Sequence, residues 1–211
     1  MKKLAIIGSG DLGRLIAYYA IQDNQFQVVG FFDDYAKTGS SVDNIKILGK
    51  ILDLEKFGMN EVFDVVICGI GYKDLTFREN LFNQLENKLD FANLIHSSCY
   101  VDASCNFGKG IFMLPGSVLD YNVTIENNVV LNVSTTIAHD SLIGAHSFIS
   151  PKVAIAGFVT IGKRCNIGIN STIIDNITIT DEVQTGGGTI VINDILKKGL
   201  YVGNPSRFIR E

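Results

Sequence analysis

VVLNVSTTIAHDSLIGAHSFISPKVAI, residues 129–155, carries a large aliphatic side chain at every sixth position. The same column extends in both directions, from Val101 to Val191, and fifteen of its sixteen members are large and apolar. A second column lies four residues after the first, from Cys105 to Ile195, and contains only small or β-branched residues. The two columns together indicate a repeating unit of six residues.

A period of six predicts a solenoid of short strands. Three six-residue strands would make one triangular coil of 18 residues, with the large aliphatic side chains along its axis and the small ones inside near the corners. Coils stacked at the usual interstrand spacing of about 4.8 Å bury a continuous core that no single repeat buries alone. A β-sandwich or barrel is disfavoured, because its strands recur less regularly, every ~8–12 residues.

The first 97 residues have a different pattern. Short apolar runs typical of buried strands occur at residues 3–7, 26–32, 63–68 and 91–95, and amphipathic helical spacing occurs at residues 11–22 and 73–89. Strands that alternate with helices predict βαβ units and a parallel sheet. We therefore expect a small Rossmann-like α/β domain over residues 1–97 and an all-β parallel β-helix, with a short tail, over residues 98–211.

Composition narrows the function classes. Lys and Arg number 18 against 22 Asp and Glu, a formal net charge of −4, which argues against a nucleic-acid partner. No apolar run approaches ~18 residues, so we expect no membrane span. The four cysteines lack CxxC or zinc-type spacing and no charged-then-apolar leader precedes residues 1–5, which predicts a cytoplasmic protein with reduced thiols. Cys105 and Cys165 belong to the second column and are expected in the core.

Residues 8–13, GSGDLG, match G-x-G-x-x-G directly after a predicted strand and at the start of a predicted helix. Such glycines let the backbone approach a pyrophosphate, and the helix N-terminus supplies N–H donors. Asp33, twenty residues after Gly13, can accept hydrogen bonds from a ribose or base. Gly69 follows another strand end and is expected to line the same crevice. The motif fits NAD, a nucleotide-linked sugar, or a glycine turn that only packs helix on strand; the short domain disfavours NAD.

The three histidines differ in their expected positions. His139 occupies the third position of its hexad, outside both columns, and is followed by Asp140. A histidine beside a carboxylate can act as a general base near neutral pH; the alternative is a surface histidine next to a chance acid. His146 is expected on the outer surface or in a subunit contact, and His96 is expected to be structural. With only two histidines in the coils, a three-ligand zinc site is not expected and no metal is predicted.

Several stretches together resemble the hexapeptide-repeat sugar acyltransferases of the sialic acid O-acetyltransferase type. Among these, the chain is most similar to N-acetyltransferases of nucleotide-linked 4-amino-4,6-dideoxy sugars, such as bacillosamine precursors and perosamine. The stretches are residues 7–13, 31–34, 132–144, 168–171, 186–188 and 202–206. The resemblance implies left-handed winding, against the usual crossover rule, and a homotrimer. It also implies acetyl transfer from acetyl-CoA to an amino or hydroxyl group of a nucleotide-linked sugar, in surface glycan biosynthesis.

The resemblance further implies roles for single residues. His139 would be the base, Asp140 the carboxylate that raises its basicity, and Asn132 a residue that orients the acceptor. Gly157, one coil after His139, would place its N–H near the thioester carbonyl. The remaining implied contacts are Ile169 and Gly187 with the coenzyme between subunits, and Gly10, Asp11, Leu12, Asp33 and Asp34 with the nucleotide.

Two departures from the family pattern are present. Relatives often have Glu where this chain has Asp140, and a coenzyme-contacting histidine where it has Phe148, so that contact is not carried over. Three rival functions stay open: a non-catalytic nucleotide-binding protein that uses the solenoid for trimerisation, an O-acetyltransferase of a sialic acid-like sugar, and an NAD-dependent oxidoreductase.

Overall fold

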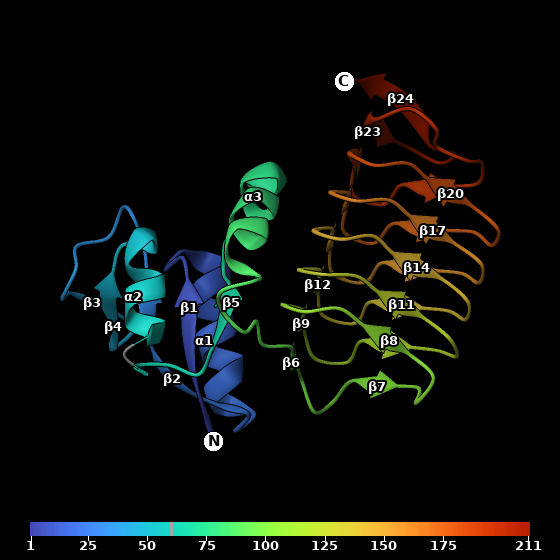
Figure 1. Ribbon diagram of the computed structural model, residues 1–211. Helices are drawn as coiled ribbons and strands as arrows, with labels where there is room; N and C mark the ends of the chain where they lie inside the picture. Colours follow the sequence, from blue (N-terminus) through green and yellow to red (C-terminus); the bar gives the residue numbers. More distant parts are fainter. Residues whose placement is uncertain (60) are drawn as a thin grey trace. The chain divides into compact units, whose positions relative to one another are not determined.

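The computed structural model describes residues 1–59 and 61–211. The chain divides into two compact units, Met1–Leu94 and Ile95–Glu211, so the division falls slightly before the boundary expected at residue 97 (Figure 1). Among the described residues, no helix combines the length and the apolar character needed to cross a membrane.

The N-terminal unit is a mainly parallel sheet with helices, in the strand order β3-β4-β2-β1-β5. Only the β3–β4 pair is antiparallel, and Phe91 extends the sheet by pairing in parallel with Val66. Its strands are β1 (Lys2–Ile7), β2 (Phe26–Phe32), β3 (Ser41–Val42), β4 (Ile45–Gly49) and β5 (Val65–Cys68); its helices are α1 (Asp11–Gln22), α2 (Leu54–Met59) and α3 (Leu75–Leu85), with short 3-10 turns η1 (Ile51–Asp53) and η2 (Tyr72–Asp74). The expected Rossmann-like α/β unit is confirmed.

Two expected elements have shifted boundaries. The helix predicted over residues 73–89 is α3, which begins later because Asp74 caps it: the Asp74 carboxylate accepts the Phe77 N–H at 2.8 Å. The strand predicted from residue 63 begins at Val65. Strands β3 and β4 were not anticipated, because β3 has only two residues and β4 has only five, with Lys46 exposed between Ile45 and the buried Ile47.

The second unit is a stack of short strands that pair in parallel, except for the last two, which pair antiparallel. They are β6 (Leu94–Ile95), β7 (Tyr100–Val101), β8 (Asn106–Phe107), β9 (Phe112–Met113), β10 (Val118–Leu119), β11 (Thr124–Ile125), β12 (Val130–Leu131), β13 (Thr136–Ile137), β14 (Leu142–Ile143), β15 (Phe148–Ile149), β16 (Ala154–Ile155), β17 (Thr160–Ile161), β18 (Asn166–Ile167), β19 (Thr172–Ile173), β20 (Thr178–Ile179), β21 (Val183–Thr185), β22 (Ile190–Val191), β23 (Gly199–Val202) and β24 (Arg207–Arg210). From β7 to β19 each strand pairs with the strand three further on, as in Leu131↔Ile149, which is 18 residues later. The arrangement is that of a left-handed parallel β-helix, as expected.

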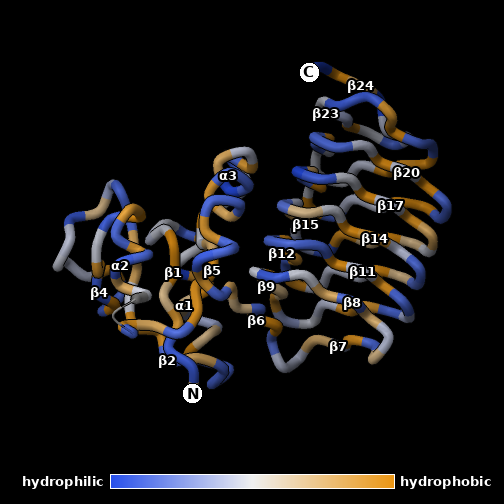
Figure 2. The backbone as a smooth tube through the Cα atoms, viewed as in Figure 1, coloured by the Kyte–Doolittle hydropathy of each residue, from blue (hydrophilic) through white to orange (hydrophobic). Residues whose placement is uncertain are grey.

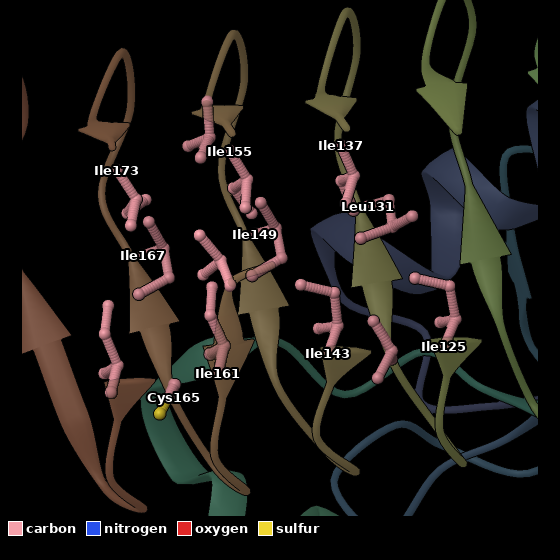
Figure 3. Packing of buried hydrophobic residues seen from close by; sticks show 14 of the residues in the cluster. Ile125, Leu131, Ile137, Ile143, Ile149, Ile155, Ile161, Cys165, Ile167 and Ile173 are labelled. Atoms are coloured by element: carbon pink, nitrogen blue, oxygen red, sulfur yellow. The ribbon is translucent and has the colours of Figure 1, made fainter. Parts of the chain in front are cut away.

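The two six-residue columns form one buried core along the axis of this unit. Every member of the first column lies in one of the strands β7–β22, and Figure 3 shows the isoleucines of successive coils facing one another across the interior. In Figure 2 the hydrophobic segments recur at β8, β11, β14 and β17. The exception in the first column, Thr185, is also buried, and its hydroxyl accepts the Gly168 N–H at 2.8 Å.

Small polar residues of the second column are buried with their hydrogen bonds made. The Ser141 hydroxyl donates to the Ala156 carbonyl at 2.9 Å, and the Ser147 hydroxyl donates to the Gly162 carbonyl at 2.9 Å. The Cys165 thiol reaches the Thr180 carbonyl at 3.2 Å, and its burial raises its pKa to about 12. Cys165 is therefore a core residue and a poor nucleophile at neutral pH.

A third column, absent from the sequence interpretation, makes the corners. Every sixth residue from Gly110 to Gly188 has a positive φ, between +53° and +75°, which turns the chain between faces. The column divides into three corners, each repeating every 18 residues: corner A (Asn122, Asp140, Phe158, Asn176), corner B (Gly110, Asn128, His146, Arg164, Glu182) and corner C (Gly116, Ser134, Lys152, Asn170, Gly188). Gly, Asn and Asp are frequent there because they tolerate left-handed backbone best.

Truncating one axial isoleucine tests this packing. We expect Ile161→Ala to lower the free energy of unfolding by about 2–5 kcal/mol, because Ile161 is fully buried and the stacked coils cannot close the cavity. The control is Thr160→Ala on the same strand, whose side chain is exposed, with an expected change within about 0.5 kcal/mol. Urea unfolding at fixed protein concentration measures both; equal effects would contradict the assigned core.

Candidate active site

The glycine loop, from the end of β1 into the first turn of α1, contains Gly8, Gly10 and Gly13, and the surroundings of these glycines differ. Gly8 has a φ of +93°, and a Cβ on Gly13 would lie 2.0 Å from the Gly8 carbonyl oxygen, so the backbone itself requires both. Gly10 is the N-cap of α1 with a φ of −73°, and a Cβ there would meet nothing within 4 Å. No contact among the described residues explains why Gly10 lacks a side chain, and the result is open space at the N-terminus of α1.

The loop after β5 packs directly on this glycine loop. A Cβ on Gly69 would lie 2.6 Å from the Cα of Gly13. Arg78 of α3, only 1% exposed, donates through Nη1 to the carbonyls of Cys68 and Ile70, which flank Gly69. The sequence interpretation missed Arg78, although it lies three residues before Leu81 on the buried face of the helix.

Asp33 ties the glycine loop to the segment after β2. Oδ2 of Asp33 accepts both the N–H and the hydroxyl of Ser9 at 2.7 Å, and Oδ1 accepts the N–H groups of Tyr35 and Ala36 at 2.8 and 2.9 Å. Burial acts to raise the pKa of Asp33, but these hydrogen bonds outweigh it and leave the pKa below its usual value. These four hydrogen bonds hold the glycine loop to the segment after β2, and the contact of Asp33 with a nucleotide stays a prediction.

The other predicted nucleotide contacts lie at the same edge of the sheet. Asp11 is exposed in the first turn of α1 and Leu12 is half-buried beside it. Asp34 is exposed and accepts the Ile51 N–H at 2.9 Å, while Lys50 holds the Asp34 carbonyl at 2.6 Å. A cavity of about 340 Å³ opens beside Asp34, lined also by η1 and one side of α3.

In the β-helix, corner A carries a hydrogen-bonded relay. Asp140 accepts from the Asn122 side-chain amide at 2.7 Å through Oδ1 and contacts His139 Nδ1 at 3.0 Å through Oδ2. The Asn122 bond first, and then the His139 bond, hold the pKa of Asp140 below its usual value. Because an ionised carboxylate only accepts, Nδ1 donates to Asp140, and in the neutral imidazole this leaves the lone pair on Nε2. The His139 side chain is 45% exposed, so a substrate can reach it.

Asn122 was missed by the sequence interpretation, but the repeat contained the signal. It lies 18 residues before Asp140, one coil away on the same corner. Counting 18 residues from each candidate residue would have found it. Asn122 donates to Oδ1 of Asp140, the oxygen that does not contact the imidazole. It thereby holds the carboxylate that orients His139.

Gly157 lies one coil beyond His139, as the spacing predicts. A Cβ on Gly157 would lie 2.8 Å from both Cε1 and Nε2 of His139, so the imidazole occupies the place of the missing side chain. Among the described residues, no acceptor within the chain is found for the Gly157 N–H. Phe158 follows, and its ring makes a T-shaped contact with the imidazole at 5.1 Å between centroids.

The remaining predicted residues are not brought to His139 within one chain. Asn132 precedes corner C, one face away, and its amide donates to the Ile149 carbonyl at 3.3 Å. Ile169 and Gly187 also lie at corner C, where a Cβ on Gly187 would be 3.0 Å from Cγ2 of Ile169. The predicted coenzyme contacts therefore occupy two different corners of the single chain.

The other histidines do not join this relay. His146 at corner B is only 4% exposed, and its Nδ1 lies 3.2 Å from Asn128 Nδ2 in the preceding coil, so an outer-surface position is wrong. The expectation was wrong because the two sequence columns did not show that position 146 is a corner, where His146 lies against Asn128, 18 residues earlier. His96 Nδ1 accepts the Ser98 N–H at 3.1 Å in a local turn. Within residues 1–59 and 61–211, no cluster of three or more His, Cys, Asp or Glu could hold a metal ion.

These features define a class of fold: a Rossmann-like unit with a glycine loop, followed by a hexapeptide-repeat left-handed β-helix with a histidine–aspartate pair at one corner. Residues 3–85 match the family model of the PglD N-terminal domain. The expected resemblance to nucleotide-sugar N-acetyltransferases of the hexapeptide family is confirmed by the following similarities.

Similar solved structures span the whole chain. The acetyltransferase domain of PglB from Neisseria gonorrhoeae FA1090 is 26% identical with a TM-score of 0.90, covering 99% of this chain and 100% of that one. The same domain in complex with acetyl coenzyme A has a TM-score of 0.90 at 25% identity, over 99% of each chain. PerB from Caulobacter crescentus, solved with CoA and GDP-perosamine, shares the fold at 23% identity with a TM-score of 0.90, over 98% of this chain and 97% of that one.

Curated relatives match a shorter stretch. UDP-3-O-acylglucosamine N-acyltransferase from Bordetella pertussis is 42% identical over 79 residues, which is 37% of this chain. The matched stretch spans 22% of that relative, about a fifth of its length.

Substitutions in the glycine loop test which glycine the backbone requires and which glycine borders open space. We expect Gly13→Ala to destabilise the N-terminal unit by about 3 kcal/mol, because its Cβ would meet the Gly8 carbonyl. Gly10→Ser should change stability by less than about 1 kcal/mol, because its side chain enters open space and serine is a good N-cap. Amide hydrogen exchange in α1 and β1 measures both, and equal protection in the two variants would contradict this difference.

Proposed function

We propose that this protein transfers an acetyl group from acetyl-CoA to an amino group of a nucleotide-linked sugar, with His139 as general base. The nucleotide would bind at the Gly8–Gly13 loop and the reaction would occur at corner A. The acceptor class we favour is a 4-amino-4,6-dideoxy sugar used in surface glycans.

The observation that carries this proposal is the Asn122–Asp140–His139 relay with Gly157 against the imidazole. It supplies an oriented base with a lone pair on Nε2 of the neutral imidazole and, one coil away, a backbone N–H for which the described residues offer no acceptor. These are the two groups that direct acyl transfer needs: one to remove a proton and one to stabilise an oxyanion. The full-length similarity to the PglB domain, solved with acetyl coenzyme A, supports the donor.

The proposed reaction is a single displacement through a tetrahedral intermediate. His139 Nε2 removes a proton from the acceptor amine while the amine nitrogen attacks the thioester carbonyl carbon. The Gly157 N–H donates to the oxyanion that forms. When the intermediate collapses, the carbon–sulfur bond breaks and the imidazolium returns the proton to the departing thiolate. Asp140, ionised because its pKa is lowered, stabilises the imidazolium in between.

The proposed nucleotide site uses the open space in front of Gly10. A pyrophosphate there would accept backbone N–H bonds from the first turn of α1, where the helix dipole favours negative charge. The match of residues 3–85 to the PglD N-terminal domain supports this site. The cavity beside Asp34 gives room for the nucleoside.

We further propose that the active assembly is a homotrimer. Gly157 lies at corner A, whereas Ile169 and Gly187 lie at corner C of the same chain. One coenzyme molecule can contact Gly157 together with Ile169 and Gly187 only if a neighbouring copy brings its corner C beside corner A of the first copy. A cyclic arrangement of three copies repeats this groove three times and closes.

Replacing the base tests the proposed chemistry. We expect His139→Ala to lower kcat/KM for acetyl transfer by about 10²–10⁴-fold, because proton removal in the transition state is lost. Circular dichroism and size by light scattering should be unchanged, since the side chain is half exposed. His96→Gln, a histidine replacement outside the relay, should keep full activity.

The assay measures thiol release from acetyl-CoA, with UDP-, GDP-, CMP- and dTDP-linked 4-amino sugars as acceptors. Unchanged transfer in His139→Ala would exclude this base, and no transfer by the wild type would favour the non-catalytic alternative.

The nucleotide site is tested by binding alone. We expect Gly10→Ser to weaken binding of the accepted nucleotide sugar at least about tenfold, because the added side chain enters the space proposed for the pyrophosphate. Isothermal titration measures it, with acetyl-CoA binding as the internal control that should not change. An unaltered dissociation constant for the nucleotide sugar would place its binding elsewhere.

A further inference from the structure

Phe158 is an unexpected residue at corner A. Its backbone has a φ of +57°, in the left-handed region that disfavours residues with a bulky side chain. The other corner A residues, Asn122, Asp140 and Asn176, are of the types that tolerate this conformation. In the part of the chain that the structure describes, Phe158 is the one large apolar residue with a positive φ.

Packing within a single chain does not account for this phenylalanine. Its side chain is 55% exposed, and it is not among the residues of the axial core cluster. An asparagine at this position would satisfy the corner without the strain and without exposing an aromatic ring to water. Strained residues that burial does not compensate are found preferentially at functional sites.

The contact that Phe158 does make is with His139. The two rings lie 5.1 Å apart between centroids at an interplanar angle of 89°, the T-shaped geometry that aromatic pairs prefer. The Phe158 N–H also donates to the His139 carbonyl at 3.1 Å, so the backbone holds the ring in place one coil above Asp140. The imidazole is then fixed by three neighbours: Asp140 at Nδ1, Gly157 beside Nε2, and Phe158 against the ring.

We infer that Phe158 is a positioning residue that holds the His139 imidazole in the orientation needed for proton transfer. The inference rests on the proposed function of His139. Without the phenyl ring, the half-exposed imidazole gains rotamers in which Nδ1 leaves Asp140 and Nε2 no longer faces the acceptor. Catalysis is sensitive to such misplacement, and a shift of about 1 Å can lower a rate by ~10²-fold. The chain therefore retains a residue that is unfavourable for the corner but favourable for the base.

The test is a substitution that should improve stability and impair catalysis together. We expect Phe158→Asn to leave the Tm unchanged or higher, because asparagine suits the left-handed corner. The same variant should lower kcat about 10–100-fold while the KM values for acetyl-CoA and the nucleotide sugar stay within about twofold. Phe158→Tyr keeps the ring and should retain kcat. Glu182→Asn places asparagine at a left-handed position of corner B, away from the proposed groove between corners A and C, and should leave kcat unaltered.

A spectroscopic measurement makes the contact testable apart from activity. In the wild type and in Phe158→Tyr, the aromatic ring should displace the His139 Hε1 proton resonance; in Phe158→Asn, that displacement should disappear. Retained kcat in Phe158→Asn, with His139→Ala inactive, would overturn the positioning role and leave the proposed function intact. No transfer by the wild type would overturn both. A drop in kcat of Phe158→Asn that came with a lower Tm would also contradict the inference, because it would indicate a structural role.

Discussion

The packing of large aliphatic side chains along the axis of the β-helix is the constraint on which the rest of this unit depends. One buried residue in every six fixes the length of each strand, and three strands fix the coil at 18 residues. The register cannot slip by one residue, because the whole column would then face water. Positions outside the column are thereby fixed as well, including the corners with their left-handed backbone.

This constraint converts sequence distance into spatial contact. Residues 18 apart lie one above another, so Asn122 reaches Asp140, and the imidazole of His139 fills the space that Gly157 leaves empty. The site is partly exposed, yet its side chains are contacted by neighbouring coils: Asp140 by Asn122 of the coil before, and His139 by Gly157 and Phe158 of the coil after. The corner leaves His139 half exposed, and the stacked core holds its neighbours in place, which are the two conditions that the proposed proton transfer requires.

Much of this could be predicted from sequence, since periodicity and glycine spacing are local patterns. The six-residue columns gave the β-helix, and GSGDLG gave the strand–loop–helix of the first unit. The corner backbone was not predictable from the columns, and without it neither the burial of His146 nor the role of Asn122 was evident. Asp33 shows a different limit: its position in the motif was clear, but its hydrogen bonds with Ser9, Tyr35 and Ala36 depend on how two loops meet.

The most direct measurement of the central claim is a crystal structure of the protein with acetyl-CoA and its nucleotide-sugar acceptor analogue bound. We expect the acceptor nitrogen or oxygen to lie about 2.6–3.2 Å from His139 Nε2, with the Gly157 N–H directed at the thioester carbonyl. A coenzyme bound away from corner A, or an imidazole turned from the acceptor, would contradict it.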